Sequence, residues 1–560
     1  MNGGEALVDA LKAAGVSHVF GLLGSTTMEV YDALYSHESI KYVGVRDERA
    51  GTHMMDAFGR IARRPGVFLA GQAGPGAANM VTGLAQAKLA YSPVVAITGL
   101  ASSSHLGRDA FQEIDQQAIF APVTKRTISV PRADRIPEFV KEAFRIANSG
   151  RRGPVVLQIP RDYFAQNIES GIQSAKDYVV DTSGLVNVSG LRRVAELLRK
   201  ASAPLIIAGA GIKWGDGSAS LGKLAERLSI PVAVSAGHPD ILPNDHPMFF
   251  GQVGPRGNAV ASQLARDADL IIALGTRLGF NTTFYNHDNL SATAKIVQID
   301  IDPEAIGRFF KVELGLVSDA GAAAATLDEL MAEVKGDGVA WLDWSRRASD
   351  QRRSLLEERE RQGETKRTPL AAERVFMEIR EVLPRDAIVT LDAGTMCLQA
   401  TDQLRYFVPP ALLTPLDFGL VGFSYAAGLG AKTAAPKRPV VTLMGDGGFA
   451  MTMAEITTAV EHGIATVAVV LDNGCWGAEK AYQRDFYNGR FIGADIKSMP
   501  YDKVAELGGA RGYAVNAPGE LSDALHTALK ANEPSVIHVK VDPNAMISFR
   551  RDSFQHRASS

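Results

Sequence analysis

A strand–helix–strand pattern between residues 439 and 471 constrains the fold of this 560-residue chain more than any other feature. Residues 439–444 and 466–471 are short apolar runs of the kind that form buried parallel strands. Residues 454–462, between them, carry a helix pattern that a glycine closes. Two parallel strands joined by a helix form a βαβ unit, so we expect an open parallel sheet with helices on its faces.

Polar residues follow both strands of this unit. Gly445-Asp446-Gly447 comes directly after the first strand, and Asn473 comes directly after the second. Parallel strands end at one edge of their sheet, and open α/β sheets bind ligands there. Glycines at that edge let backbone amides approach a diphosphate, and a carboxylate and an amide oxygen are hard ligands that suit Mg²⁺. The triplet alone is weak evidence, because it also occurs in ordinary turns between strand and helix.

The same βα alternation occurs in three stretches of similar size, which predicts three doubly wound α/β domains with parallel sheets. We place these domains at 1–167, 188–340 and 366–545, followed by a tail at 546–560, with a charged helix and linker near 344–367. The expected strands are 42–45, 67–70, 94–97 and 155–159 in the first, 204–211, 231–234, 270–274 and 296–300 in the second, and 387–391, 440–444, 466–471 and 535–539 in the third.

Composition excludes several classes of function. The net charge is −3, with 46% apolar and 22% charged residues, so we expect no nucleic-acid or membrane partner. The two cysteines, Cys397 and Cys475, have no metal-type spacing and suit a reducing compartment. The first residues lack the basic and apolar pattern of a signal peptide, so we expect a cytoplasmic protein.

The Gly-Asp-Gly triplet and Asn473 resemble the cofactor motif of the thiamine diphosphate (ThDP) enzymes. This resemblance implies that Asp446 and Asn473 bind Mg²⁺ by their side chains and Cys475 by its main-chain carbonyl. It also implies that Gly445, Gly447 and Gly448 contact the cofactor. The three domains would then be a pyrimidine-binding domain, a central domain and a diphosphate-binding domain.

Residues 46–60, Arg-Asp-Glu-Arg-Ala-Gly-Thr-His-Met-Met-Asp-Ala-Phe-Gly-Arg, resemble the segment of acetolactate synthase-like enzymes that carries the activating glutamate. The resemblance implies that Glu48 is catalytic, sharing a proton with the aminopyrimidine ring of the cofactor, which itself supplies the hard chemistry. Glu48 also follows a predicted strand and opens a helix. A carboxylate that merely stabilises the helix N-terminus is the alternative.

Residues 419–422, Gly-Leu-Val-Gly, resemble the family element that bends the cofactor. Val421 would be the apolar wedge under the bend, and the Gly419 carbonyl would accept a hydrogen bond from the 4′-amine. A plain core position is the alternative for Val421. Other loops that resemble cofactor-facing loops of the family contain Gly24, Ser25, Asn79, Gln112, Gly394 and Thr395, and Gln112 would face the reacting carbon.

The residues after Asn473 indicate which members of the family are most similar. Acetolactate synthases have Met and Trp at the positions where this chain has Ala478 and Tyr482. Residues 476–480, Trp-Gly-Ala-Glu-Lys, and 549–552, Phe-Arg-Arg-Asp, instead resemble the sulfoacetaldehyde acetyltransferases. Trp476, Lys480, Tyr482, Arg550 and Arg551 are therefore the candidate substrate residues, although surface charges are an equal alternative for the two arginines.

The resemblance implies ThDP- and Mg²⁺-dependent cleavage of a bond next to a carbonyl, with transfer of the two-carbon unit. The expected reaction converts sulfoacetaldehyde and phosphate to acetyl phosphate and sulfite. The alternatives are 2-oxo acid decarboxylation and carboligation, as in acetolactate synthase, and a non-catalytic ThDP-binding paralogue. We expect a homodimer or homotetramer with the active site between subunits. We expect no functional FAD in the central domain.

Overall fold

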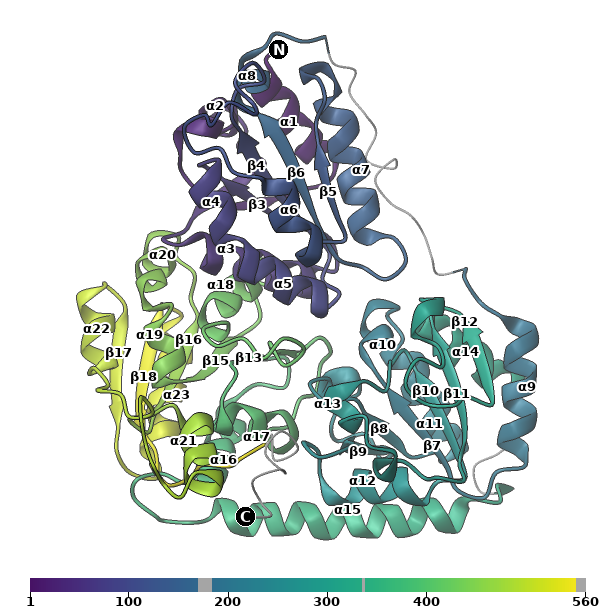
Figure 1. Cartoon of the computed structure of the whole chain (residues 1–560). Coiled ribbons are helices and arrows are strands. Elements are labelled where there is room, and N and C mark those ends of the chain that lie inside the picture. The colour runs from purple at the N-terminus through teal and green to yellow at the C-terminus, as the bar shows by residue number, and fades with distance from the viewer. Residues whose placement is uncertain (170–183, 335–337, 550–560) are drawn as a thin grey trace.

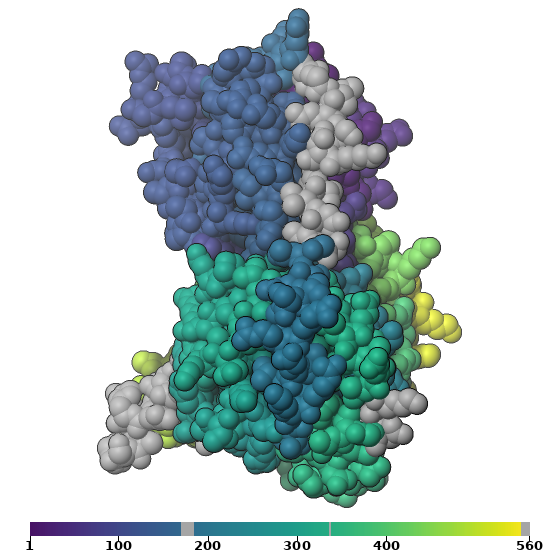
Figure 2. Space-filling view, turned by 90° about the vertical axis from the view of Figure 1, so that its right-hand side faces the viewer, coloured from purple at the N-terminus to yellow at the C-terminus, as the bar shows by residue number. Residues whose placement is uncertain are grey.

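The computed structural model describes residues 1–169, 184–334 and 338–549, which form three α/β units. Each unit is built on a six-stranded parallel sheet with helices on its faces (Figure 1). In that view the first unit lies at the top, the third at the lower left and the central unit at the lower right. Figure 2, seen from the side of the central unit, shows the first unit stacked above it. The predicted fold class is confirmed.

The first sheet has the strand order β2-β1-β3-β4-β6-β5. Its strands are β1 (His18–Leu22), β2 (Lys41–Gly44), β3 (Gly66–Ala70), β4 (Val94–Leu100), β5 (Arg126–Ser129) and β6 (Pro154–Pro160). The helices of this unit are α1 (Gly3–Ala13), α2 (Met28–Tyr35), α3 (Glu48–Ala62), α4 (Gly74–Asn79), α5 (Val81–Leu89), α6 (Gln116–Phe120), α7 (Ile136–Asn148) and α8 (Arg161–Ala165). β3 and β6 are buried along their whole length, which explains why their residues are apolar except for Gln158 of β6.

The central sheet has the strand order β12-β11-β10-β7-β8-β9. Its strands are β7 (Pro204–Ala208), β8 (Val232–Val234), β9 (Phe249–Gln252), β10 (Leu270–Leu274), β11 (Lys295–Asp300) and β12 (Leu314–Val317). The helices are α9 (Val188–Arg199), α10 (Ala210–Trp214), α11 (Ser218–Leu228), α12 (Ala259–Asp267), α13 (Phe280–Thr283) and α14 (Ala320–Leu330). The strand order reverses between β7 and β10, and loops diverge at such a point to leave a crevice.

The third sheet has the strand order β14-β13-β15-β16-β18-β17. Its strands are β13 (Ile388–Leu391), β14 (Leu412–Leu413), β15 (Val440–Gly445), β16 (Val467–Asp472), β17 (Arg511–Val515) and β18 (Ser535–Lys540). The helices are α16 (Ala372–Val382), α17 (Thr395–Gln403), α18 (Ser424–Ala434), α19 (Asp446–Ala450), α20 (Ile456–Glu461), α21 (Gly477–Phe486), α22 (Tyr501–Leu507) and α23 (Glu520–Ala531). β15 pairs with β16 in a register that places Gly445 opposite Leu471.

The first and third units pack against each other through α3 and α18. Met54 and Met55 of α3 share one buried apolar cluster with Tyr425 and Leu429 of α18. A Cβ atom at Gly430 would lie only 2.0 Å from the Met54 carbonyl oxygen, so the two helices touch backbone to backbone there. This close approach fixes the first unit relative to the third, and with it the start of α3.

A 22-residue helix, α15 (Leu342–Gly363), runs along the bottom of Figure 1 beneath the central and third units. Arg352 donates to the carbonyl oxygens of Asn244 at 2.8 Å and His246 at 2.9 Å in the central unit. Arg359 donates to the carbonyl oxygen of Asp402 at 3.0 Å in the third unit. The charged segment therefore forms a helix, as predicted, but two of its arginines hold it against the protein instead of pointing into solvent.

The strands that sequence patterns missed are mostly edge strands. β5, β9, β12, β14 and β17 each lie at the edge of a sheet. β12 alternates buried and exposed residues, and β14 has only two residues, so neither contains a long apolar run. The remaining missed strand, β1, is interior, and His18 and Gly21 interrupt its apolar run.

Candidate active site

A cavity of about 380 Å³ opens at the carboxyl edge of the third sheet, and we call it the third-unit cavity. Two glycines of the predicted motif form part of its wall by close approach. A Cβ atom at Gly447 would lie 2.6 Å from the Trp476 ring, and one at Gly448 would lie 2.7 Å from Asp392 Oδ2. Of the residues predicted from sequence, those that line this cavity are Gly394, Thr395, Gly419, Val421, Gly445, Asp446, Gly447, Gly448, Asn473, Cys475, Trp476 and Tyr482.

Asp446 is 1% exposed and lies at the start of α19. Its Oδ2 atom accepts a hydrogen bond from Ser498 Oγ, and its main-chain carbonyl accepts one from the Tyr501 hydroxyl at 3.0 Å. Burial raises the pKa of Asp446 to about 6, against the hydrogen bond from Ser498. Sequence patterns did not identify Ser498, because it lies 52 residues away in a loop without a recognisable motif.

Asp472, the last residue of β16, connects this carboxyl group to a buried polar network. Ser498 Oγ also lies 2.8 Å from Asp472 Oδ1, and His538 Nε2 lies 2.7 Å from Asp472 Oδ2. Lys540 Nζ also donates to Asp472 Oδ2. Burial alone would raise the pKa of Asp472, but the hydrogen bonds from His538, Lys540 and Ser498 outweigh it and lower the pKa. Asn473 therefore follows a strand end that is held in place by three side chains.

The donor set around Asp446 fits a divalent cation with a diphosphate. Asn473 Oδ1 and the Asp446 carboxylate are oxygen ligands of the kind that Mg²⁺ prefers. The Cys475 backbone N–H donates to Asn473 Oδ1 at 3.3 Å, so the turn after β16 holds the amide group in place. The Thr395 hydroxyl is buried, lines the cavity and has no hydrogen-bond partner among the described residues. A buried hydroxyl of this kind suits a phosphate oxygen.

A loop that contains Gly419 and Val421 forms another wall of the cavity. Gly419 and Gly422 have φ of 78° and 85°, a region that favours glycine. The backbone N–H of Gly422 donates to the Asp392 carboxylate at 3.0 Å. Asp392 is buried, and burial raises its pKa to about 7. We call residues 419–422 the wedge loop, and Asp392 anchors it to the end of β13.

The residues predicted in the first unit form a second group, at the carboxyl edge of the first sheet. Glu48 is 5% exposed, and its Oε2 atom accepts a hydrogen bond from Asn79 Nδ2 at 2.9 Å. A Cβ atom at Gly74 would lie 2.4 Å from the Gln112 carbonyl oxygen, so Gln112 lies over the start of the same helix as Asn79. Glu48 and Gln112 do not line the third-unit cavity of their own chain.

Gly24 and Ser25 lie beside this second group. A Cβ atom at Gly24 would come within 2.5 Å of the Gly71 carbonyl oxygen, and Ser25 Oγ lies 3.5 Å from Gln72 Oε1. Both contacts are to the turn after β3. The structure therefore gathers the first-unit residues on one sheet edge, apart from the residues of the third unit.

The candidate substrate residues are only partly brought together. Trp476 and Tyr482 line the third-unit cavity. Lys480 does not, because it pairs with Asp495 and lies 5.2 Å from the centre of the Phe491 ring. Arg550 and Arg551 lie outside the described residues. Arg256 also lines the cavity, and no sequence pattern identified it. Glu479 and Phe549 line it too; they belong to the motifs at 476–480 and 549–552 but were not among the candidate site residues.

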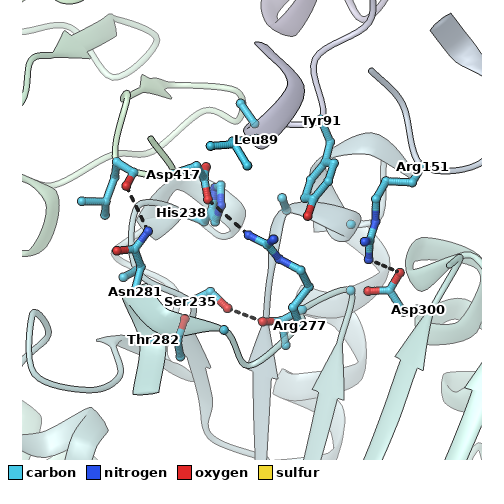
Figure 3. A pocket seen from close by; sticks show the side chains of 18 of the residues that line it. Leu89, Tyr91, Arg151, Ser235, His238, Arg277, Asn281, Thr282, Asp300 and Asp417 are labelled. Atoms are coloured by element: carbon cyan, nitrogen blue, oxygen red, sulfur yellow. Dashed lines mark hydrogen bonds and ion pairs between the residues drawn. The ribbon is translucent and has the colours of Figure 1, made fainter. Parts of the chain in front are cut away.

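A second cavity of about 420 Å³ lies where the central unit meets the other two, and we call it the central cavity (Figure 3). The Tyr91 ring lies between two guanidinium groups, 4.6 Å from Arg151 and 5.1 Å from Arg277. Arg151 also lies 3.3 Å from Asp300, whose pKa burial raises. This cavity lies at the switch point of the central sheet, where open α/β sheets bind ligands. The absence of a functional flavin in the central unit stays a prediction.

Comparison with protein families agrees with this architecture. Three models describe a thiamine pyrophosphate enzyme: its N-terminal TPP binding domain matches residues 1–119, its central domain 191–330 and its C-terminal TPP binding domain 392–539. The chain therefore belongs to the family of thiamine diphosphate-dependent enzymes.

Curated relatives match along nearly the whole chain. A sulfoacetaldehyde acetyltransferase of Castellaniella defragrans is 34% identical over 99% of this chain and 95% of the relative. A sulfoacetaldehyde acetyltransferase of Alcaligenes xylosoxydans xylosoxydans is 36% identical with the same coverage. A probable acetolactate synthase large subunit of Methanocaldococcus jannaschii is 31% identical over 97% of this chain and 92% of the relative. Throughout the described ranges, the helices fall short of the length and apolar character needed to cross a membrane.

Proposed function

We propose that this enzyme converts sulfoacetaldehyde and phosphate to acetyl phosphate and sulfite. The main support is the full-length similarity to two sulfoacetaldehyde acetyltransferases, at 34% and 36% identity. The reaction balances without an external oxidant: the aldehyde C–H bond gives up its hydrogen as a proton, the C–S bond breaks and sulfite leaves with the bonding electrons. The carbon that held the sulfonate takes up a proton to become the methyl group, and a phosphate oxygen forms the new bond to the former aldehyde carbon. Bound ThDP supplies the carbon nucleophile that this chemistry needs.

In this proposal the third-unit cavity holds Mg²⁺ and the diphosphate. Asp446 and Asn473 bind the metal by their side-chain oxygens, and Cys475 by its main-chain carbonyl. The Thr395 hydroxyl, which has no hydrogen-bond partner among the described residues, and the close glycine backbone support a diphosphate in the same place. The residues assigned to the diphosphate are Gly394, Thr395, Gly445, Gly447 and Gly448.

The wedge loop holds the reactive half of the cofactor. The Gly419 carbonyl accepts from the cofactor amine, and the Val421 side chain fills the space beneath the bend. Asp392 supports these roles, because its bonds to the backbone of Gly422 keep the loop against the cavity. The small Val421 side chain can support the bend only if the loop cannot move away from the cofactor. The hydrogen bond from Gly422 to buried Asp392 holds the loop in place.

Glu48 completes the site of a second subunit. Its carboxyl group moves a proton at the cofactor pyrimidine, Asn79 orients it at 2.9 Å, and Gln112 orients the reacting group. Within one chain Glu48 does not line the third-unit cavity, which favours a homodimer or homotetramer with shared sites. Leu23 and Phe111 beside the first group and Phe418 beside the wedge loop are exposed apolar side chains that a second copy would cover.

Acetolactate synthase-type chemistry is the second candidate. Its support is the 31% identity to a probable acetolactate synthase large subunit over 97% of the chain. The same Glu48, Mg²⁺ and wedge-loop assignments serve both reactions, because they act on the cofactor and not on the leaving group.

The decisive assay measures sulfite release from sulfoacetaldehyde by the purified protein with ThDP and Mg²⁺, with phosphate present and then omitted. The expected result is phosphate-dependent sulfite release together with acetyl phosphate. The absence of sulfite in a protein that binds ThDP, with acetolactate formed from pyruvate, would replace the proposal with the second candidate.

A further inference from the structure

We propose that Arg256 of the central unit binds the oxyanion of the substrate, a sulfonate or a phosphate, inside the third-unit cavity. This inference rests on the proposed function, because it assigns the residue that recognises the anionic reactants. Arg256 would therefore determine which anions the enzyme accepts, whereas the cofactor residues come from the other two units.

Arg256 lies in the loop that follows β9, on the wall between the two cavities. It lines both the third-unit cavity and the central cavity. The other residues that line both cavities are Leu416, Phe418 and Gly419. Since Gly419 begins the wedge loop, Arg256 lies on the side of the cavity assigned to the reacting half of the cofactor. The metal and diphosphate residues lie instead in the turns after β15 and β16.

The guanidinium of Arg256 is oriented by contacts on the central unit. Its Nη1 atom donates to Asn281 Oδ1 at 2.7 Å, and its carbon lies 5.5 Å from the centre of the Phe284 ring. Asn281 Nδ2 in turn donates to the Leu416 carbonyl at 2.9 Å (Figure 3). A guanidinium has five N–H donors in a planar fork, which matches the oxygens of a sulfonate, phosphate or carboxylate.

The loop that carries Arg256 is built to hold its position. Gly254 has φ of 88°, and a Cβ atom there would lie 1.8 Å from the Thr282 carbonyl oxygen. Asn258 Nδ2 donates to the Phe250 carbonyl at 3.0 Å and to Asp402 Oδ1 at 3.1 Å. The loop is thus pressed against α13 on one side and fixed to α17 on the other. Recognition of an oxyanion requires such a supported side chain.

Charge supports the same assignment. Among the described residues that line the third-unit cavity, Arg256 is the only lysine, arginine or histidine. Asp392, Asp446 and Glu479 line the same cavity and are acidic. An anion that leaves water for this cavity needs an opposite charge to offset its desolvation. Lys480, a cation that the sequence suggested for the substrate, does not line this cavity and is paired with Asp495.

The test uses the ThDP–Mg²⁺ holoenzyme and the variants Arg256→Gln, Arg256→Lys and Arg308→Gln. Arg308 is the matched control, because it is exposed and its guanidinium also contacts a phenylalanine ring, that of Phe309. We measure KM and kcat with sulfoacetaldehyde and phosphate, and the dissociation constants of ethanesulfonate, inorganic phosphate and ThDP by calorimetry. Arg256→Gln should raise the KM and the dissociation constant of at least one anion by about 10- to 100-fold, with ThDP affinity unchanged.

The pattern of changes identifies the anion. An effect on sulfoacetaldehyde and ethanesulfonate alone assigns Arg256 to the donor, and an effect on phosphate alone assigns it to the acceptor. Arg256→Lys should lose less affinity for the anion than Arg256→Gln, because lysine keeps the positive charge but lacks the planar set of N–H donors of the guanidinium. Unchanged affinity for both anions in Arg256→Gln overturns the inference, and so does an equal loss of ThDP affinity.

Failure of the proposed function is a separate outcome. If the wild-type enzyme releases no sulfite, the reaction proposed above is wrong, and the calorimetric titrations still decide the role of Arg256. Binding of ethanesulfonate or phosphate that Arg256→Gln weakens and Arg308→Gln leaves unchanged supports an oxyanion site. No binding of either anion to wild-type holoenzyme refutes it.

Discussion

Replacing Asp392 by asparagine should remove a pH-dependent loss of stability from the third unit. The Asp392 carboxyl group is 2% exposed and accepts hydrogen bonds from the backbone N–H groups of Ala393 at 2.7 Å and Gly422 at 3.0 Å. Burial raises its pKa from 3.8 to about 7, because the charged form loses more hydration than these bonds return. Asparagine keeps the oxygen acceptor and cannot ionise.

The sign and size follow from the raised pKa. The folded protein holds this proton more tightly than the unfolded chain, so the stabilisation is complete below pH 3.8 and is lost as the pH rises through about 7. Between pH 5 and pH 8 this single group should reduce the free energy of unfolding by about 3 kcal/mol. The corresponding change in the opening equilibrium of the surrounding backbone is about 100-fold.

Hydrogen exchange of peptides that cover the wedge loop is the appropriate assay, because a chain of three units need not unfold in one step. Corrected for intrinsic exchange, protection at Gly422 and Phe423 should fall from pH 5 to pH 8 in the wild-type enzyme. In Asp392→Asn it should stay constant. Asp386→Asn, at an exposed position of the same unit, should behave like the wild type. Parallel pH profiles for Asp392→Asn and wild type would refute the reasoning.

Other substitutions test the site and the packing between units. Glu48→Gln should lower kcat by about 100-fold or more with ThDP affinity retained, measured by sulfite release and calorimetry, and turnover near the wild-type level would exclude the proposed role of Glu48. Removal of Mg²⁺ with EDTA, or Asp446→Asn, should weaken ThDP binding by about 10-fold or more, and an unchanged dissociation constant would contradict the metal assignment. Arg60→Ala should cost about 3–5 kcal/mol of stability. The reason is that Arg60 Nη2 lies 2.6 Å from Asp56 Oδ2, and Asp56 is fully buried. Thermal unfolding measures this loss, with Arg308→Ala as the exposed control. Equal unfolding temperatures for Arg60→Ala and Arg308→Ala would contradict the prediction.

Much of the arrangement of residues at the candidate site could be predicted from residue order alone. The apolar runs that flank Gly445-Asp446-Gly447 and Asn473 form adjacent parallel strands, so the two motifs emerge side by side at one edge. Local rules suffice here, because a βαβ unit brings its two strand ends together through a single helix. The same logic placed Glu48 at a strand end and at the start of a helix, where the structure has it.

The tertiary structure decided the features that depend on distant segments. Arg256 of the central unit lines the third-unit cavity, and Ser498 contacts Asp446, which lies 52 residues away in the sequence. No local sequence pattern predicts either contact. Burial by several elements, not residue type, raises the pKa of Asp392. Sequence periodicity therefore determined the three parallel sheets and the positions of most of their interior strands, since strand and helix patterns are local. The charges around each site residue and the contacts between units could be learned only from the tertiary structure. Both arise only when loops from separate parts of the chain pack together.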